Sequence, residues 1–161
     1  MLRLNLRDVP GFSPLVRDYV HAFSRLAPFY AHDPHAPGSY EIQVGRCDAR
    51  AYPREALRAA LLAQQAAWNP PEVAYRRIED LCAPQGLAVF TGQQTGLFGG
   101  PLFTLYKALT TLSLAARLQE ELRRPVVPLF WMASEDHDVA EADHVHLADR
   151  NGGLVQLRHA A

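Results

Sequence analysis

Several features that would mark a secreted, membrane-bound or nucleic-acid-binding protein are scarce in this sequence. It has two cysteines, Cys47 and Cys82, and no CxxC pair, so neither a zinc knuckle nor a redox pair is indicated and both thiols are expected to be reduced. No stretch approaches the roughly 18 apolar residues that span a membrane. The first 16 residues are broken by charges and prolines, unlike a signal peptide, so we expect a cytoplasmic protein.

The sequence also lacks an excess of charge of either sign. The 16 Lys and Arg residues are balanced by 17 Asp and Glu residues, which gives a formal net charge of −1. Nucleic-acid and membrane surfaces need a clustered basic excess, so neither partner is predicted. What is present is 161 residues with 48% hydrophobic content, enough for a folded domain with a core of its own.

The first half of the chain has a helical pattern. Apolar spacing over residues 13–27 predicts a helix, with Ser13 as its cap and Pro14 as its first residue. Prolines and glycines predict mainly loop over residues 28–53, with at most a short extended piece at residues 40–44. Two more helices are predicted at residues 55–68 and 71–82. We therefore expect a helical amino-terminal region over residues 1–84.

The pattern changes at residue 85. Apolar runs at residues 87–91 and 126–133 predict buried strands, and the 3.6-residue period between them predicts a helix over residues 102–122. Such a unit forms a right-handed crossover between parallel strands that helices cover on both faces, so the fold class is α/β. Pro128 lacks a ladder donor, which suggests an edge strand or a bulge. A short helix over residues 139–143 and a hairpin around residues 149–153 complete the predicted region, residues 85–161.

A glycine-rich turn follows the first predicted strand. The turn contains four glycines, Gly92, Gly96, Gly99 and Gly100. They let backbone amides approach a ligand at the start of the next helix, where an anion is the ligand expected. The spacing matches neither GxGxxG nor GxxxxGK[ST], and a tight connector with no ligand is an equally good interpretation of the glycines alone. The adjacent amides of Gln93 and Gln94 favour ligand binding. Lys107 either reaches forward to a phosphate or is simply solvated.

Four polar residues follow the second predicted strand: Glu135, Asp136, His137 and Asp138. Carboxyl ends of parallel strands share one edge of the sheet, so this cluster should face the glycine-rich turn. His137 could act as acid or base and Asp136 could hold a ribose hydroxyl, whereas a solvated helix start accounts less well for all four. A metal site that combines His137 with His144 and His146 is a further possibility that no fixed ligand spacing supports.

Two long motifs, TGQQTGLFGGPLFTLYKALTTLSLA and PVVPLFWMASEDHD, carry a specific resemblance. The sequence resembles the bacillithiol-biosynthesis cysteine-adding enzymes over most of its length. The resemblance implies a Rossmann-like core and a later coiled coil through which the family forms homodimers. It also implies a ligase that joins the carboxyl group of cysteine to the amine of glucosaminyl malate. A free carboxylate is a poor electrophile, so activation by a nucleotide such as ATP would explain an anion-binding turn.

The resemblance also assigns residues. It implies catalytic roles for Asp136, His137 and Asp138, a substrate contact for Glu135, no metal, and a nucleotide-binding set: Thr91, Gly92, Gln93, Gln94, Gly99, Gly100 and Lys107. Phe103 stands where a tyrosine is usual, which removes one hydroxyl. Because family members are considerably longer, we expect a fragment with an uncertain activity of its own. The alternatives are a noncatalytic remnant and, on the histidines alone, a small metal-dependent hydrolase.

Overall fold

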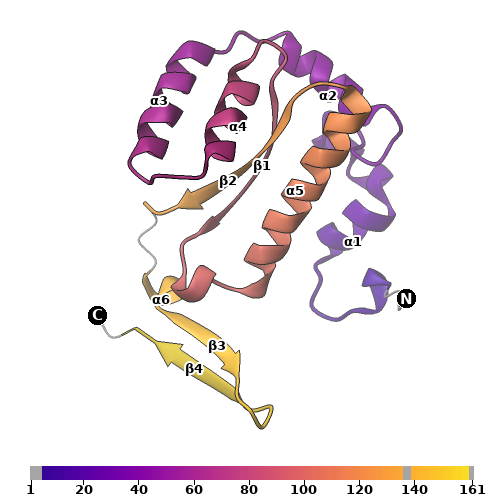
Figure 1. Ribbon diagram of the computed structural model, residues 1–161. Helices are drawn as coiled ribbons and strands as arrows, with labels where there is room; N and C mark the ends of the chain where they lie inside the picture. Colours follow the sequence, from indigo (N-terminus) through magenta and orange to yellow (C-terminus); the bar gives the residue numbers. More distant parts are fainter. Residues whose placement is uncertain (1–4, 136–138, 160–161) are drawn as a thin grey trace. The chain divides into compact units, whose positions relative to one another are not determined.

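The computed structural model describes residues 5–135 and 139–159, which belong to two compact units (Figure 1). Unit 1 comprises residues 1–51 and unit 2 residues 52–161. The expected boundary after residue 84 separates two domains, and it remains a prediction. The boundary between the two compact units is a different feature and lies between residues 51 and 52. Among the described helices, none has the length and apolar character needed to cross a membrane.

Unit 1 consists of short helices around a small cluster of rings formed by Tyr19, Phe23, Tyr30 and His35. Its elements are η1 (Leu6–Asp8), α1 (Pro14–His21), η2 (Phe23–Arg25), η3 (Ala27–Phe29) and α2 (Ser39–Asp48). Helix α1 begins as predicted, because the Ser13 hydroxyl accepts a hydrogen bond from the Val16 amide at 3.3 Å. The expected extension to residue 27 is wrong. Ala22 leaves the helical conformation at φ −149°, and the turn buries Phe23 and Leu26.

Helix α2 replaces the loop that the prolines and glycines predicted. The alternation of Tyr40, Ile42 and Val44 suggested an extended piece, yet Ile42 is exposed while Tyr40, Val44 and Cys47 are half-buried. That spacing of four and three residues is helical. Gly38, at φ 79°, turns the chain into the helix, and the buried Ser39 hydroxyl donates to the Asp33 carbonyl oxygen.

Unit 2 contains a parallel pair of strands flanked by helices. Its elements are α3 (Arg54–Ala66), α4 (Glu72–Cys82), β1 (Leu87–Gln94), η4 (Leu97–Gly99), α5 (Leu102–Leu122), β2 (Val126–Ala133), α6 (Val139–Ala142), β3 (His144–Ala148) and β4 (Leu154–Arg158). β1 and β2 pair in parallel from Leu87↔Val126 to Gln94↔Ala133. Helix α5 lies along one side of the pair, and α3 and α4 lie on the other (Figure 1). The α/β class is confirmed.

Burial on both faces holds only at the start of the strands. Successive strand residues point to opposite faces, and Val126 and Val127 are 3% and 2% exposed, so helices cover both faces there. Further along, Phe90 and Trp131 are exposed, and the expectation of fully buried strands is wrong for this part. Within the described residues β2 has one strand neighbour, which places Pro128 on an edge strand.

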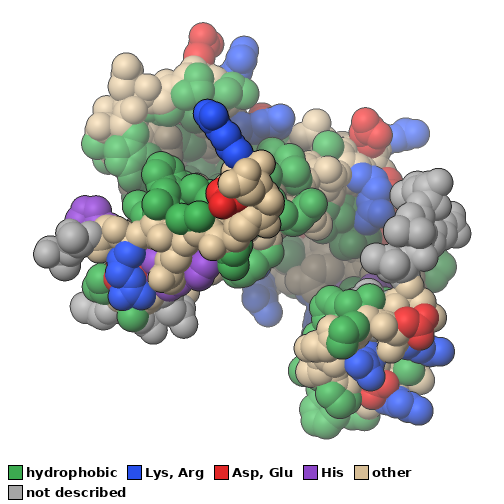
Figure 2. Space-filling model, turned by 90° about the horizontal axis from the view of Figure 1, so that it is seen from below, with side chains coloured by type: hydrophobic (Ala, Val, Ile, Leu, Met, Phe, Trp, Pro, Cys, Tyr) green, Lys and Arg blue, Asp and Glu red, His purple; other side chains and the backbone are tan. Residues whose placement is uncertain are grey.

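Helix α5 has the predicted bounds but packs through small residues. Thr111 and Ala115 are buried with Leu118, and the Thr111 hydroxyl is satisfied by the Lys107 carbonyl oxygen at 2.8 Å. Small side chains let the helix backbone approach the strands closely. The apolar residues that set the helical period are largely exposed: Leu102, Leu105, Tyr106, Leu109 and Leu112. Figure 2 shows apolar side chains among the exposed side chains in the view from below Figure 1.

The connection from α4 to β1 is a tight junction around Gly86. A Cβ at this position would meet the backbone carbonyl oxygens of Leu81 and Asp80 well inside van der Waals contact. The guanidinium of Arg54 donates to the Leu81 carbonyl oxygen at 2.7 Å and to the Gly86 carbonyl oxygen at 3.2 Å, which ties α3 to this junction. The start of β1 is therefore fixed by close backbone packing at Gly86 together with the guanidinium of Arg54.

The Gly86→Ala substitution should destabilise the chain strongly, because the obstructing atoms are backbone and cannot rotate away. We expect a loss of about 3 kcal/mol in the free energy of unfolding, the upper end of typical overpacking costs. The matched control is Gly45→Ala, since Gly45 lies in α2 with open space where its Cβ would be. This change should stabilise by about 0.5–1 kcal/mol if α2 is helical. Urea unfolding measures both, and a destabilised Gly45→Ala variant would contradict the helix.

The thiol of Cys82 should react slowly with alkylating reagents at neutral pH. Burial, followed by the nearby Glu79 carboxylate, raises the pKa of the Cys82 thiol above its usual value. The thiolate is the reactive form, so its fraction at neutral pH is smaller than for an ordinary cysteine. In a Cys47→Ser variant, labelling by iodoacetamide should be slower than that of free cysteine at pH 7.5 and should accelerate as the pH rises. Labelling as fast as free cysteine at neutral pH would contradict this assignment.

Candidate functional site

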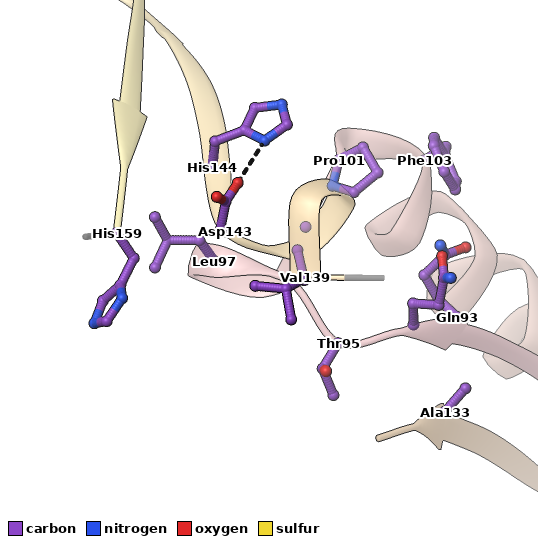
Figure 3. Close-up of a pocket in the computed structure, with 14 residues that line it drawn as sticks. Gln93, Thr95, Leu97, Pro101, Phe103, Ala133, Val139, Asp143, His144 and His159 are labelled. Carbon is purple, nitrogen blue, oxygen red and sulfur yellow. Dashed lines mark hydrogen bonds and ion pairs between the residues drawn. The ribbon is translucent and has the colours of Figure 1, made fainter. Parts of the chain in front are cut away.

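A pocket of about 440 Å³ lies at the carboxyl edge of the strand pair, within unit 2 (Figure 3). One wall comes from the end of β1, the following turn and the start of α5; the other comes from α6 and the β3–β4 hairpin. Its lining residues are Gln93, Gln94, Thr95, Gly96, Leu97, Gly100, Pro101, Phe103, Ala133, Val139, Ala142, Asp143, His144 and His159. Pockets of this size bind small molecules.

The strand wall is organised by Lys107. Its Nζ donates to the Gln93 Oε1 atom at 2.8 Å and to the Gly92 carbonyl oxygen at 3.2 Å. The same ammonium lies 5.1 Å from the centre of the Phe103 ring. With its Oε1 atom engaged, Gln93 is left with amide N–H groups to offer an acceptor in the pocket. Lys107 thus positions a hydrogen-bond donor there.

The turn after β1 has a backbone that glycine favours. Gly99 and Gly100 have φ values of 89° and 79°, and Gly100 lines the pocket. Pro101 caps α5, whose first turn contains no acidic residue. The first amides of a helix have no intrahelical partner and lie at the positive end of its dipole. This end of the pocket is therefore suited to an anion.

The hairpin wall holds an acidic and a basic side chain in contact. Asp143 Oδ1 lies 3.0 Å from His144 Nδ1, and Asp143 Oδ2 lies 3.5 Å from the Arg158 guanidinium. The side chains of Asp143 and His144 are 17% and 24% exposed. Strand pairing sets this arrangement, because His144 is opposite Arg158 in the β3–β4 register. The turn that joins the strands is held by Asp149, whose Oδ1 accepts two backbone amides.

The structure brings part of the predicted nucleotide-binding set to the pocket. Gln93, Gln94 and Gly100 line it, and Lys107 contacts it through Gln93. Strand β1 is three residues longer than the expected end at residue 91, so the two glutamines lie on the strand and not in the turn. The parallel pairing that should place both strand ends at one edge is present.

The remaining predicted residues lie away from the pocket lining or outside the described residues. Thr91 pairs with Phe130, and Gly99 belongs to η4; neither is a lining residue. Glu135 lies in the turn that follows β2 and also does not line the pocket. Asp136, His137 and Asp138 lie outside the described residues. The ligand roles of all these residues stay predictions.

Gly92 has a packing reason to be glycine. Its Cβ would lie 3.0 Å from the Trp131 carbonyl oxygen and 3.1 Å from the Trp131 Cβ atom. These distances are tighter than most side-chain contacts, so the close approach of β1 and β2 at this point favours a residue without a side chain. The carbonyl oxygen of Gly92, which accepts from Lys107, connects this packing to the pocket wall.

The alternative metal site is not assembled by the described histidines. The rings of His144 and His146 contact each other at 5.3 Å between centroids and 88° between planes. Among the residues that the structure describes, no group of three or more His, Cys, Asp or Glu side chains is placed to hold a metal ion. His137, the third histidine of that hypothesis, lies outside those residues.

Two titratable residues of the pocket lining were not anticipated from the sequence. Asp143 and His159 line the pocket, and the His159 amide donates to the Asp143 carbonyl oxygen at 2.7 Å. His144 was considered only as a metal ligand. The adjacency of Asp143 and His144 at the start of a predicted strand was the available signal, but that pattern does not reveal which element the hairpin packs against. Contact between β3 and η4 supplies this information.

A Rossmann-like α/β domain, with a ligand-sized pocket where its parallel strands end, is the class that this fold and site define. The family model described as "Bacillithiol biosynthesis BshC, N-terminal Rossmann-like domain" matches residues 2–160. The chain belongs to this family, which confirms the resemblance carried by the two long motifs.

Relatives named "Putative cysteine ligase BshC" match most of the chain. The relative from Anoxybacillus flavithermus is 38% identical over 143 residues, which cover 89% of this chain and 26% of the relative. The relative from Salinibacter ruber is 39% identical over 88% of this chain and 26% of its own length. The relative from Chlorobaculum tepidum is 42% identical over 91% of this chain and 27% of its own length. The chain thus spans about a quarter of the length of these relatives.

Replacing Gln93 by glutamate should weaken anion binding without unfolding the chain. A glutamate keeps an acceptor for Lys107 but loses the N–H donor, so affinity for inorganic phosphate should fall about tenfold or more, the worth of one hydrogen bond to a charged group. Calorimetric titration measures this change, and the melting temperature checks the fold. The matched control is Gln85→Glu, which adds the same charge near the start of β1, away from the pocket lining. Equal phosphate affinity in both variants would contradict the role of Gln93.

Proposed function

We propose that this chain contributes a substrate pocket to a cysteine ligase that completes bacillithiol. The reaction forms an amide between the carboxyl group of cysteine and the amine of glucosaminyl malate. The observation that carries the proposal is the Lys107-positioned amide of Gln93 beside the glycine turn, in a family whose relatives are named as cysteine ligases. The pocket would receive the activated carboxyl end of cysteine.

The residues present fit a phosphate-bearing nucleotide. Gly100 gives a ligand close access to the backbone, α5 begins at the same end of the pocket, and Gln93 adds a side-chain donor. When bound, ATP would supply the phosphoryl or adenylyl group that makes the carboxyl group reactive. The protein's part is to hold the phosphates and to orient the carboxyl group.

The predicted site residues divide by how they would act. Gln93, Gln94 and Gly100 would contact the phosphates directly, and Lys107 would act by orienting Gln93. Thr91, Gly92 and Gly99 would act through the backbone that shapes this wall. Glu135 is proposed to contact the substrate amine, and Asp136, His137 and Asp138 are proposed as the catalytic carboxylates and imidazole. Homodimerisation is proposed on the resemblance alone, and a cytoplasmic location on the charges and prolines that break the first 16 residues.

The test is an assay of the protein expressed from its complete natural reading frame with cysteine, glucosaminyl malate and ATP. We expect bacillithiol by mass spectrometry, with consumption of ATP in equal amount. Residues 1–161 should bind ATP in calorimetric titration, and the Gln93→Glu change should weaken that binding.

Each contrary outcome has a separate meaning. Product formed at the same rate without ATP would remove the nucleotide from the proposal. No product, together with no binding of ATP, cysteine or glucosaminyl malate by a folded protein, would identify a noncatalytic member of the family. Tight retention of zinc or manganese after dialysis would favour the metal-dependent hydrolase.

A further inference from the structure

The hairpin wall of the pocket contains a carboxylate–imidazole pair for which the proposed function has so far no role. Asp143 and His144 both line the pocket and contact each other through Oδ1 and Nδ1 at 3.0 Å (Figure 3). Gln93 and Gly100 belong to the other wall. The pocket therefore has an anion-binding wall and, separately, a wall with a group that can exchange protons.

Asp143 is fixed by contacts on several sides. Its amide donates to the Val139 carbonyl oxygen at 2.9 Å, its carbonyl oxygen accepts from His159 at 2.7 Å, and its Oδ2 lies 3.5 Å from Arg158. The carboxylate has little freedom to turn away from His144. A carboxylate held in this way fixes the orientation of the imidazole that it contacts.

The contact decides which ring nitrogen of His144 is available. A carboxylate accepts hydrogen bonds, so Nδ1 carries the proton that faces Asp143 and Nε2 carries a lone pair. Among the described residues, the charged and titratable groups that contact Asp143 or His144, or share the pocket lining with them, are Arg158 on β4, the His146 ring at 5.3 Å, and His159.

We propose that His144 is a catalytic residue that accepts the proton of the incoming amine, and that Asp143 is its positioning residue. This inference rests on the proposed ligase function. An amine attacks only through its lone pair, and the nitrogen must lose a proton as the amide forms, so a base beside the acceptor carbon accelerates the step. The two walls supply the two requirements of the reaction, a site for the anion and a base.

The step balances with an activated cysteine as co-reactant, a mixed anhydride of its carboxyl group with phosphate or a nucleotide. The amine nitrogen forms the C–N bond to the acyl carbon. The C–O bond to phosphorus-bound oxygen breaks, and the phosphate or nucleotide leaves with that electron pair. The proton released from nitrogen passes to Nε2 of His144, and Asp143 stabilises the resulting imidazolium.

The first test needs only residues 1–161 and does not depend on activity. Long-range ¹H–¹⁵N spectra of histidine side chains report which ring nitrogen is protonated. We expect the Nδ1–H form for His144, and a shift toward the Nε2–H form in Asp143→Asn, whose amide can donate to Nδ1. A wild-type ring protonated at Nε2 and free at Nδ1 would overturn the inference.

The second test separates activation from transfer in the protein expressed from its complete reading frame. Hydroxylamine is largely unprotonated at neutral pH and needs no base, so it traps activated cysteine as the hydroxamate. The His144→Asn variant should form hydroxamate at the wild-type rate but lose about 10²–10⁴-fold in bacillithiol formation, the usual worth of a general base. Asp143→Asn should lower the transfer rate in the same direction. Gln156→Ala, on the same face of the hairpin but outside the pocket lining, is the control and should retain both activities.

The outcomes are distinguishable. If the wild type forms neither hydroxamate nor bacillithiol, the proposed function fails and this inference fails with it. If His144→Asn forms bacillithiol at the wild-type rate, the function stands and the inference is wrong. If His144→Asn loses both activities, or melts at a much lower temperature than Gln156→Ala, His144 supports the structure and is not the base.

Discussion

Parallel pairing between β1 and β2 is the interaction on which the rest of unit 2 depends. Its register, from Leu87↔Val126 to Gln94↔Ala133, brings both strand ends to one edge of the sheet. Because Gly92 has no side chain, the strands approach closely beside Trp131, and the pairing continues to Gln94. If the pairing ended at residue 91, as the apolar run suggested, the glutamines would lie in the turn and would lack the fixed backbone that directs Gln93 toward Lys107.

Lys107 couples the sheet to the pocket. It lies one turn into α5, and its ammonium contacts a strand carbonyl oxygen, the Gln93 amide and the face of Phe103. The ammonium donates both hydrogen bonds, its charge favours the ring face, and its stem is long enough to reach β1 from the helix. The two interpretations of Lys107 from sequence, a phosphate ligand or a solvated lysine, both omitted this role as an internal connector.

The sequence predicts well what depends on local pattern. The period over residues 102–122 gave the bounds of α5, and Ser13 with Pro14 gave the start of α1, because periodicity and capping are local. Helix α2 was missed because Tyr40, Ile42 and Val44 alternate like a strand, and burial alone decides between the two periods. Only one of the two walls of the pocket was predicted. Its strand wall follows from parallel topology, whereas its hairpin wall depends on contact between β3 and η4, which no spacing within the hairpin reveals.

The division of the pocket between two distant parts of the chain also orders events during synthesis. The wall formed by β1 and the start of α5 is complete once β2 has paired with β1, but Asp143, His144 and His159 are among the last described residues to leave the ribosome. Translation adds about 5–20 residues per second, so seconds separate the emergence of the two walls. In that interval a nucleotide could meet only one wall. The nascent chain therefore acquires the proposed anion-binding surface before it acquires the imidazole proposed to act on a bound molecule.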